Sequence, residues 1–351
     1  MVISTSKRII LLVSMLLVVG TALPVKASEI IRLFGEENVG TTSGLFLRIP
    51  VGARAVALGK AYSALASDGS APFWNPAGIV RTPGLKNFFA SHMEYAADID
   101  IDYFAFHGRG QNFGLGLSMG TLRSGEILRT DEYHPNGTDS TFNANQFFMG
   151  LTLARAMTDR FSIGGTVKYF QENLDQFQIK TVLADMGIFY FLGWGDARVG
   201  FSVRNFGSDL KLDGSPADVP IDNASITDFQ SFPAPTVGAF GTARTWSLGE
   251  EVNLLTTMDF SHPSDYKESF CFGSELGLRS RLFLRGGYET SRDEGGLSGG
   301  FGVQLKRKGF LIKVDYAFND MGNFGGIHYV SVDLSPLFRL KDPDAWRRRS
   351  R

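Results

Sequence analysis

Cysteine, long apolar runs and an excess of charge of either sign are all scarce in this chain. The single cysteine, Cys271, excludes an internal disulfide. The formal net charge of −1 over 351 residues provides no broad positive field, which argues against binding to nucleic acid. The histidines lie apart from one another, without the spacing of metal ligands: His92, His107, His134, His262 and His328. The sequence therefore predicts no metal, no cofactor and no nucleic-acid partner.

No apolar run is long enough to predict a transmembrane helix, which needs roughly 18 uninterrupted apolar residues. The nearest candidate is the short run Ile9–Gly20. Lys7-Arg8 precedes it, and a short polar segment ending at Ala27 follows it, which is the pattern of a Sec signal peptide. We therefore expect residues 1–27 to be removed and the exported chain to begin near Ser28.

Glycine and aromatic residues are abundant instead. The chain has 41 Gly, 30 Phe and 10 Tyr at a mean hydropathy of −0.03. Glycine lets strands bend, and aromatic side chains populate the interfacial girdles of membrane barrels. This composition favours a curved sheet that faces lipid.

From about Leu85 onward, apolar residues alternate with polar or small ones. The segments 161–169, 252–260 and 310–318 each have one largely apolar face, and the opposite face carries charged, polar or small side chains. This period of two is typical of β-strands. A soluble sandwich would show the same alternation, so the pattern alone does not distinguish a sandwich from a barrel.

Connection lengths do distinguish the two architectures. Tight connections alternate with longer ones along the chain, as expected for a barrel with short periplasmic turns and long outer loops. The tight connections are 109–111, 157–160, 193–195, 247–249, 279–281 and 306–309, and the longer ones are 123–141, 207–232, 261–267, 291–296 and 319–326. We predict about fourteen antiparallel strands over residues 85–338, closed because lipid leaves no partner for a free sheet edge. A basic tail, 339–351, would lie in the periplasm.

Residues 28–84, ahead of the barrel, lack the strand pattern. We predict a helix from Ala53 to Ala66, then a turn, and a second helix that Asn75 caps and Pro76 begins. The segment is too small to hold a core of its own. We therefore expect it to plug the barrel as a hatch.

Two stretches of this segment match a known signature: FLRIPVGARAVALGKA (residues 46–61) and SDGSAPFWNPAG (residues 67–78). They resemble the N-terminal motif of the PorV/PorQ family, which belongs to the FadL-type outer-membrane barrels. Lys60 departs from that pattern, because a small residue, most often glycine, is expected there.

The resemblance implies a fourteen-stranded barrel with a hatch in its lumen, in the outer membrane of a Gram-negative-type envelope. PorV-like members act with the type IX secretion system and receive cargo by its C-terminal domain. FadL-type members admit long-chain fatty acids or other hydrophobic compounds through the hatch and a lateral opening. Our first hypothesis is a secretion accessory with secretion components, cargo and outer-membrane lipid as partners. The alternative is a transporter whose partners are hydrophobic small molecules.

An interaction-ready outer loop would favour the secretion role. The connection 207–232 fits this expectation because it carries several apolar residues and prolines. These are Leu210, Leu212, Pro216, Val219, Pro220 and Ile221.

Two groups of candidate site residues follow from these assignments. The predicted hatch or gate residues are Gly52, Arg54, Gly59, Asp68, Trp74, Asn75, Pro76, Ala77 and Gly78. The predicted lumen charges are Lys168, Arg198, Arg204, Asp259, Arg285, Glu289, Lys313 and Asp315. We expect the lumen charges to pair with one another and with the hatch, where Arg54 and Asp68 offer partners; lining a polar conduit is the alternative. The stretch from Trp74 to Gly78 has two interpretations, a structural anchor or a movable gate.

One motif suggests catalysis. Gly116–Gly120 matches the G-x-S-x-G pattern of serine hydrolases. That pattern needs a sharp strand-to-helix turn, whereas here it lies inside an alternating run. In a glycine-rich chain a chance match is the better explanation, so we predict no catalytic residue and no enzyme.

Overall fold

The computed structural model describes residues 39–95, 99–213, 228–291 and 295–336. The predicted signal peptide, the loop residues Pro216, Val219, Pro220 and Ile221, and the basic tail lie outside the described residues. Within the described ranges, no helix has both the length and the apolar composition needed to cross a membrane.

Fourteen antiparallel strands form a closed barrel, as predicted. Each strand pairs with its neighbours along the chain, and the pairing of the first with the last strand closes the ring. The barrel strands are β1 (Lys86–Tyr95), β2 (Ile99–Arg109), β3 (Phe113–Arg123), β6 (Ala144–Ala156), β7 (Phe161–Leu174), β8 (Phe177–Phe191), β9 (Arg198–Gly207), β12 (Val237–Ser247), β13 (Val252–Pro263), β14 (Ser269–Leu278), β15 (Leu282–Glu289), β16 (Leu297–Arg307), β17 (Phe310–Asp320) and β18 (Gly326–Pro336). Closure leaves no free edge along the ring, which satisfies the backbone hydrogen bonds of every strand.

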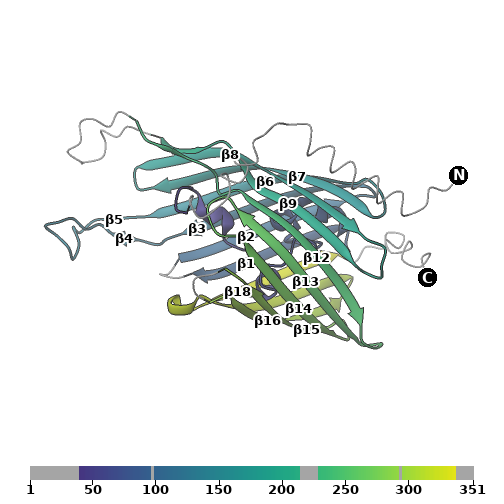
Figure 1. Cartoon of the computed structure of the whole chain (residues 1–351). Coiled ribbons are helices and arrows are strands. Elements are labelled where there is room, and N and C mark those ends of the chain that lie inside the picture. Colours follow the sequence, from purple (N-terminus) through teal and green to yellow (C-terminus); the bar gives the residue numbers. More distant parts are fainter. Residues whose placement is uncertain (1–38, 96–98, 214–227, 292–294, 337–351) are drawn as a thin grey trace.

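The two ends of the barrel differ in their connections. Short strands outside the ring lie at one end: β4 (Ile127–Leu128) pairs with β5 (Thr141–Phe142), and β10 (Leu210–Asp213) pairs with β8 and β11 (Ser231–Phe232). Figure 1 shows β4 and β5 projecting from the left end of the barrel. Among the described connections at this end, the one between β7 and β8 is the only two-residue turn. We call this the long-loop end and the other the tight-turn end.

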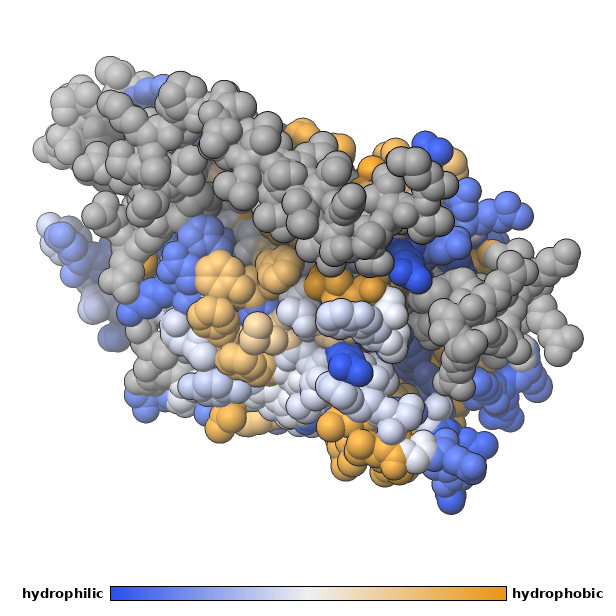
Figure 2. Space-filling model, turned by 45° about the vertical axis from the view of Figure 1, so that its right-hand side comes forward, coloured by the Kyte–Doolittle hydropathy of each residue, from blue (hydrophilic) through white to orange (hydrophobic). Residues whose placement is uncertain are grey.

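The barrel wall is apolar outside, whereas its inner face combines buried charged and polar groups with apolar side chains that pack on the hatch segment. On β7, the outward Val167 is 58% exposed, whereas the inward Thr166 and Lys168 are buried. The inward Asp315 of β17 is buried, and the outward Val314 is 43% exposed. Figure 2 shows the same arrangement from outside, with hydrophilic side chains gathered mainly toward the two ends. A sheet that faces lipid is expected to have such an apolar outer surface.

The segment ahead of β1 lies inside the ring. It contains η2 (Leu45–Arg48), α3 (Ala53–Ala57), α4 (Ala71–Trp74) and η3 (Pro76–Arg81). The α3 helix packs on β15 to β18, and η3 packs on β2, β3 and β6 to β8, across the lumen. Figure 1 shows these purple elements enclosed by strands. We call residues 44–82 the hatch segment.

The first predicted helix is wrong in length: it ends at Ala57 rather than Ala66. Gly59 and Lys60 have positive φ values of 63° and 68°, which stop the helix. Gly59 also lies against the wall, where an added Cβ would be 2.6 Å from the backbone nitrogen of Tyr288. Lys60 adopts the left-handed conformation that glycine adopts without strain, which accounts for the small residue expected there.

Wall glycines have a role that the composition does not reveal. At Gly200 an added Cβ would lie 2.0 Å from the carbonyl oxygen of Ser63, and at Gly287 it would lie 2.0 Å from the backbone nitrogen of Gly59. The hatch backbone therefore rests directly on the wall at these positions. Strand bending alone does not explain the glycine content.

Candidate functional site

Asn75 joins the two halves of the hatch segment to the wall. Its side-chain oxygen accepts from the backbone N–H of Ala77 (3.2 Å), which caps η3, and Pro76 is the first residue of that helix. Its Nδ2 donates to the carbonyl oxygens of Ser63 (2.9 Å) and Ile188 (2.9 Å). A single buried amide thus caps η3 and forms hydrogen bonds to a hatch loop and to strand β8.

Trp74 and the residues around it fill the space beside this cap. Trp74 Nε1 donates to the carbonyl of Val51 (3.0 Å). The Arg204 guanidinium of β9 lies over the Trp74 ring at 5.0 Å, a cation–π contact. Gly78 packs so closely on Ala66 that an added Cβ would overlap its carbonyl oxygen. The predicted stretch from Trp74 to Gly78 is therefore the tightly packed centre of the hatch segment.

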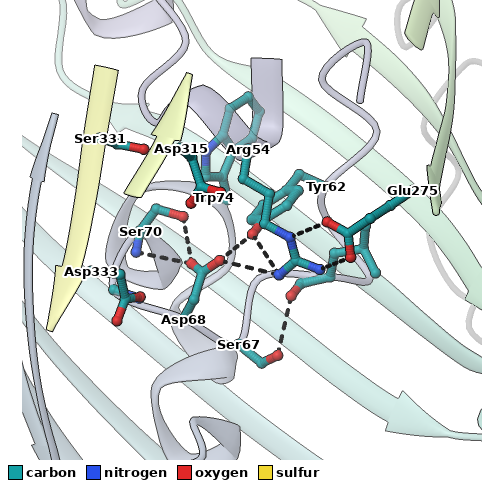
Figure 3. Close-up of polar contacts among 12 residues, drawn as sticks. Arg54, Tyr62, Ser67, Asp68, Ser70, Trp74, Glu275, Asp315, Ser331 and Asp333 are labelled. Atoms are coloured by element: carbon teal, nitrogen blue, oxygen red, sulfur yellow. Dashed lines mark hydrogen bonds and ion pairs between the residues drawn. The ribbon is translucent and has the colours of Figure 1, made fainter. Parts of the chain in front are cut away.

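Arg54 is held by carboxylates on both sides (Figure 3). Its Nε and Nη2 donate to the two oxygens of Glu275, at 2.8 and 2.9 Å. Its Nη1 lies 3.5 Å from Asp68 Oδ2, and the Tyr62 hydroxyl donates to the same Asp68 oxygen. A bidentate pair of this kind fixes orientation as well as charge. Arg54 thereby connects the hatch segment to β14.

The wall continues this chain of alternating charges. Glu275 also accepts from Arg285 Nε (2.6 Å), and Arg285 Nη1 donates to Asp315 (2.7 Å). Arg285, Glu275 and Asp315 are all buried. We call Asp68, Arg54, Glu275, Arg285 and Asp315 the charged latch. It runs from the hatch segment across β14 and β15 to β17.

Asp68 belongs to the hatch loop rather than to a strand. Burial raises the pKa of its carboxyl group, but the nearby cations Arg54 and Lys313 and the Tyr62 hydroxyl outweigh burial, so its pKa lies below the ordinary value. Asp68 therefore stays ionised and keeps its partners around neutral pH.

Other wall groups bind the hatch segment directly. Asp259 accepts from the N–H groups of Tyr62 (3.1 Å) and Ser63 (2.7 Å). The N–H of Gly52, a residue with φ of 85°, donates to Ser91 (3.2 Å). Glu289 accepts from Lys60 Nζ at 2.6 Å. These contacts satisfy hatch groups that no helix or strand pairs.

Two of the predicted charges, Lys168 and Arg198, do not belong to the charged latch. Lys168 forms a buried pair with Asp185 (2.7 Å) and donates to Asn205 (2.8 Å), beside a pairing irregularity between β8 and β9. Arg198 lies 3.5 Å from Asp196, in the tight turn before β9. The structure therefore brings most of the predicted charges to the hatch segment and puts Arg198 at the tight-turn end.

Sequence reasoning missed several groups of this site. Glu275, Asp185 and Asp333 face inward and contact the hatch segment or its supporting residues. Strand alternation could have found them, because each lies on the same face as neighbouring buried residues. Asp265, which pairs with Arg48 of the hatch segment, lies in an outer connection and gave no such signal.

A cavity of about 600 Å³ opens at the long-loop end above the hatch segment. Most of its wall is apolar, with η2 as its floor. The apolar lining includes Phe46, Ile49, Tyr95, Leu122, Ile327 and Tyr329. Arg48, Lys60, Gln146 and Asp265 lie among them as polar lining residues. We call this cavity the outer cup.

A smaller cavity of about 100 Å³ shares Arg48, Pro50, Lys60 and Tyr266 with the outer cup. Arg204 and Asp259 line it. Arg204 Nε and Asp259 Oδ1 are buried and have no hydrogen-bond partner within the described part of the chain. We call it the inner chamber; it places charged groups directly behind an apolar entrance.

The Gly116–Gly120 motif does not form the strand-to-helix turn of a serine hydrolase. Ser118 of the Gly116–Gly120 motif lies buried in the interior of β3, without the strand-to-helix turn that exposes a nucleophilic serine. Among the described residues, no three His, Cys, Asp or Glu side chains gather where they could hold a metal ion.

Solved structures with a similar fold include proteins named as transporters or channels. The P. putida toluene transporter TodX has a TM-score of 0.54 at 12% identity, covering 82% of this chain and 99% of that one. The monoaromatic hydrocarbon channel CymD has a TM-score of 0.51 at 12% identity, covering 82% and 96%. A Pseudomonas aeruginosa FadL homologue has a TM-score of 0.51 at 11% identity, covering 83% and 99%. At such low identity these similarities establish the fold alone.

Sequence comparison reaches a less specific result. No curated protein matches the chain. Residues 19–193, just under half of the chain, match the Uncharacterised protein family (UPF0164). The chain is thus similar to that family in sequence over its first half and to FadL-type outer-membrane barrels in fold.

Proposed function

We propose that this protein is an outer-membrane transporter for hydrophobic compounds, in which the hatch segment closes the barrel. The observation that carries the proposal is the outer cup, an apolar cavity that opens at the long-loop end and ends on the hatch segment. Its volume is within the roughly 300–1,000 Å³ typical of small-molecule sites. The transport channels with the same fold support the proposal.

The inner chamber favours an amphipathic substrate, such as a long-chain fatty acid. An acyl tail would gain free energy by leaving water for the outer cup. A carboxylate head would meet Arg48 and Lys60 where the two cavities join, in competition with Asp265 and Glu289, with which these cations pair. The unpartnered Nε of Arg204 lies deeper, beside the hatch residue Trp74. Movement of the hatch segment would then let the substrate pass.

Uptake measurements test this proposal. We expect Leu122→Asn to reduce uptake of radiolabelled oleate into cells that lack their own channel for it, because the amide makes the outer cup less apolar. Leu128→Asn introduces the same change on the exposed β4 and should leave uptake unchanged. Equal uptake with and without the protein would contradict the proposal.

A role in type IX secretion is the second candidate. Its support is the N-terminal motif, which resembles PorV/PorQ, together with the projecting connection that carries β4 and β5 (Figure 1). Affinity purification from native membranes tests it. Recovery of secretion components and cargo C-terminal domains would favour this role, and bound lipid without them would favour transport.

A further inference from the structure

The outer face of β12 to β15 carries a groove of about 680 Å³ that the transport proposal does not use. Thr256, Ser274 and Gly286 form its floor, because they are neighbours across three strands and have short side chains. Met258, Phe272 and Tyr288 rise along one side. The groove lies on the surface that faces lipid if the barrel sits in the outer membrane.

A cation lies at one end of this groove. Arg244 pairs across the strands with Thr256 and lies three positions before Ser247, where β12 ends at its tight turn. Its guanidinium lies over the Trp246 ring at 3.8 Å. It also lies near the β8–β9 turn, because an added Cβ at Gly195 would be 4.0 Å from Arg244 Nη2. Within the described ranges, no carboxylate forms an ion pair with Arg244.

The charges at the two ends of the outer face differ in their partners. At the long-loop end, Asp102 pairs with Arg123 (2.7 Å) and His92 (2.8 Å). At the tight-turn end, Arg155 lies over the Phe113 ring at 4.9 Å, as Arg244 lies over Trp246. Arg244 and Arg155 thus lie on aromatic rings, whereas Arg279 at the same end pairs with Glu251 (2.6 Å) and the outer-end charges pair with one another. Arg244 therefore keeps its positive charge for an external anion.

We propose that the groove binds an anionic phospholipid of the periplasmic leaflet, with its phosphate on Arg244 and one acyl chain along Thr256, Ser274 and Gly286. The inference rests on the outer-membrane placement proposed above. The three strand spacings from Arg244 to Gly286 amount to about 14 Å. This distance runs across the strands, so the chain would cross β12 to β15 rather than follow one strand. A guanidinium near the interface attracts anionic headgroups and stacks on tryptophan at the same time.

Native mass spectrometry of the purified protein with phosphatidylglycerol and phosphatidylcholine of identical acyl chains tests the inference. We expect about fivefold more phosphatidylglycerol than phosphatidylcholine bound to the unaltered protein. Arg244→Gln should abolish this preference. Arg129→Gln, which removes an arginine of the long-loop end that is paired with Asp175, should preserve it.

A second variant tests the acyl half of the site. An added Cβ at Gly286 meets nothing within 4 Å, so Gly286→Leu fills the groove without disturbing the wall. We expect it to reduce binding of both lipids, while the barrel keeps its heat resistance on gels. Equal binding of the two lipids to the unaltered protein, or an unchanged preference in Arg244→Gln, would overturn the proposal. Unchanged lipid binding in Gly286→Leu would contradict the proposed position of the acyl chain in the groove.

Oleate uptake separates this inference from the transport proposal. Lipid preference with no uptake would contradict transport alone, and uptake without lipid preference would contradict the lipid site alone.

Discussion

The two faces of the barrel wall place opposite demands on neighbouring residues. Gly286 and Gly287 are adjacent on β15, yet an added Cβ meets open space at the first and the hatch backbone at the second. On β7, Val167 is exposed on the outside and Lys168 is buried inside with Asp185. The outer face needs bulk and apolarity, and the inner face needs close fit and paired charge.

This difference shows that the two faces of the wall meet different surroundings. The outer face interacts with its surroundings through side-chain character alone, because any apolar residue of fitting size meets the need. The inner face interacts with one particular segment, so its residues are specified one by one. Substitutions on the two faces should therefore differ in kind as well as in size.

Breaking the charged latch should have the largest effect. Glu275→Ala leaves Arg54 and Arg285 buried without their shared carboxylate, which costs about 3–5 kcal/mol for a buried pair. Denaturant unfolding of the purified barrel measures the loss. Glu251→Ala removes the exposed partner of Arg279 and should cost below about 1 kcal/mol. Equal losses would contradict the charged latch.

A charge on the outer face should come next. Val167→Arg places a cation near the middle of β7 on the apolar side, at a cost of about 2–4 kcal/mol at the bilayer midplane. Unfolding in lipid vesicles measures it, and Val167→Leu serves as the control. A cost for Val167→Arg no larger than that for Val167→Leu would contradict the membrane placement.

The glycine pair on β15 sharpens the comparison within two residues. Gly287→Ala forces a Cβ against the backbone of Gly59 and should destabilise the protein by about 1–3 kcal/mol, as overpacking does. Gly286→Ala should leave the unfolding free energy nearly unchanged. Similar unfolding free energies for the two variants would show that the hatch segment can shift away from β15 without loss of stability.

Asn75→Ala should cost about as much stability as Gly287→Ala and should have the most informative effect on uptake. It removes hydrogen bonds to Ser63 and Ile188, each worth about 1 kcal/mol. If the stretch from Trp74 to Gly78 is a gate, uptake of oleate should rise while heat resistance on gels persists. A loss of heat resistance without a rise in uptake would make Asn75 an anchor only.

Strand alternation predicted the wall well because it depends on local residues. Val167 and Lys168 reveal their faces from their neighbours, and connection lengths predicted fourteen strands. The hatch helix was predicted too long, because its end depends on contact between Gly59 and Tyr288, more than 200 residues apart. Glu275 was missed for a related reason, since its importance comes from Arg54 on another element.

The sequence by itself determined the barrel, its two faces and the presence of a separate segment before it, because period-two patterning and turn spacing are local properties. Only the tertiary structure decided which charges meet, why Gly200 and Gly287 must be glycine, and where an apolar cup opens onto the hatch segment. Those features arise between residues distant in the chain, where the ring of strands closes around its own N-terminal segment.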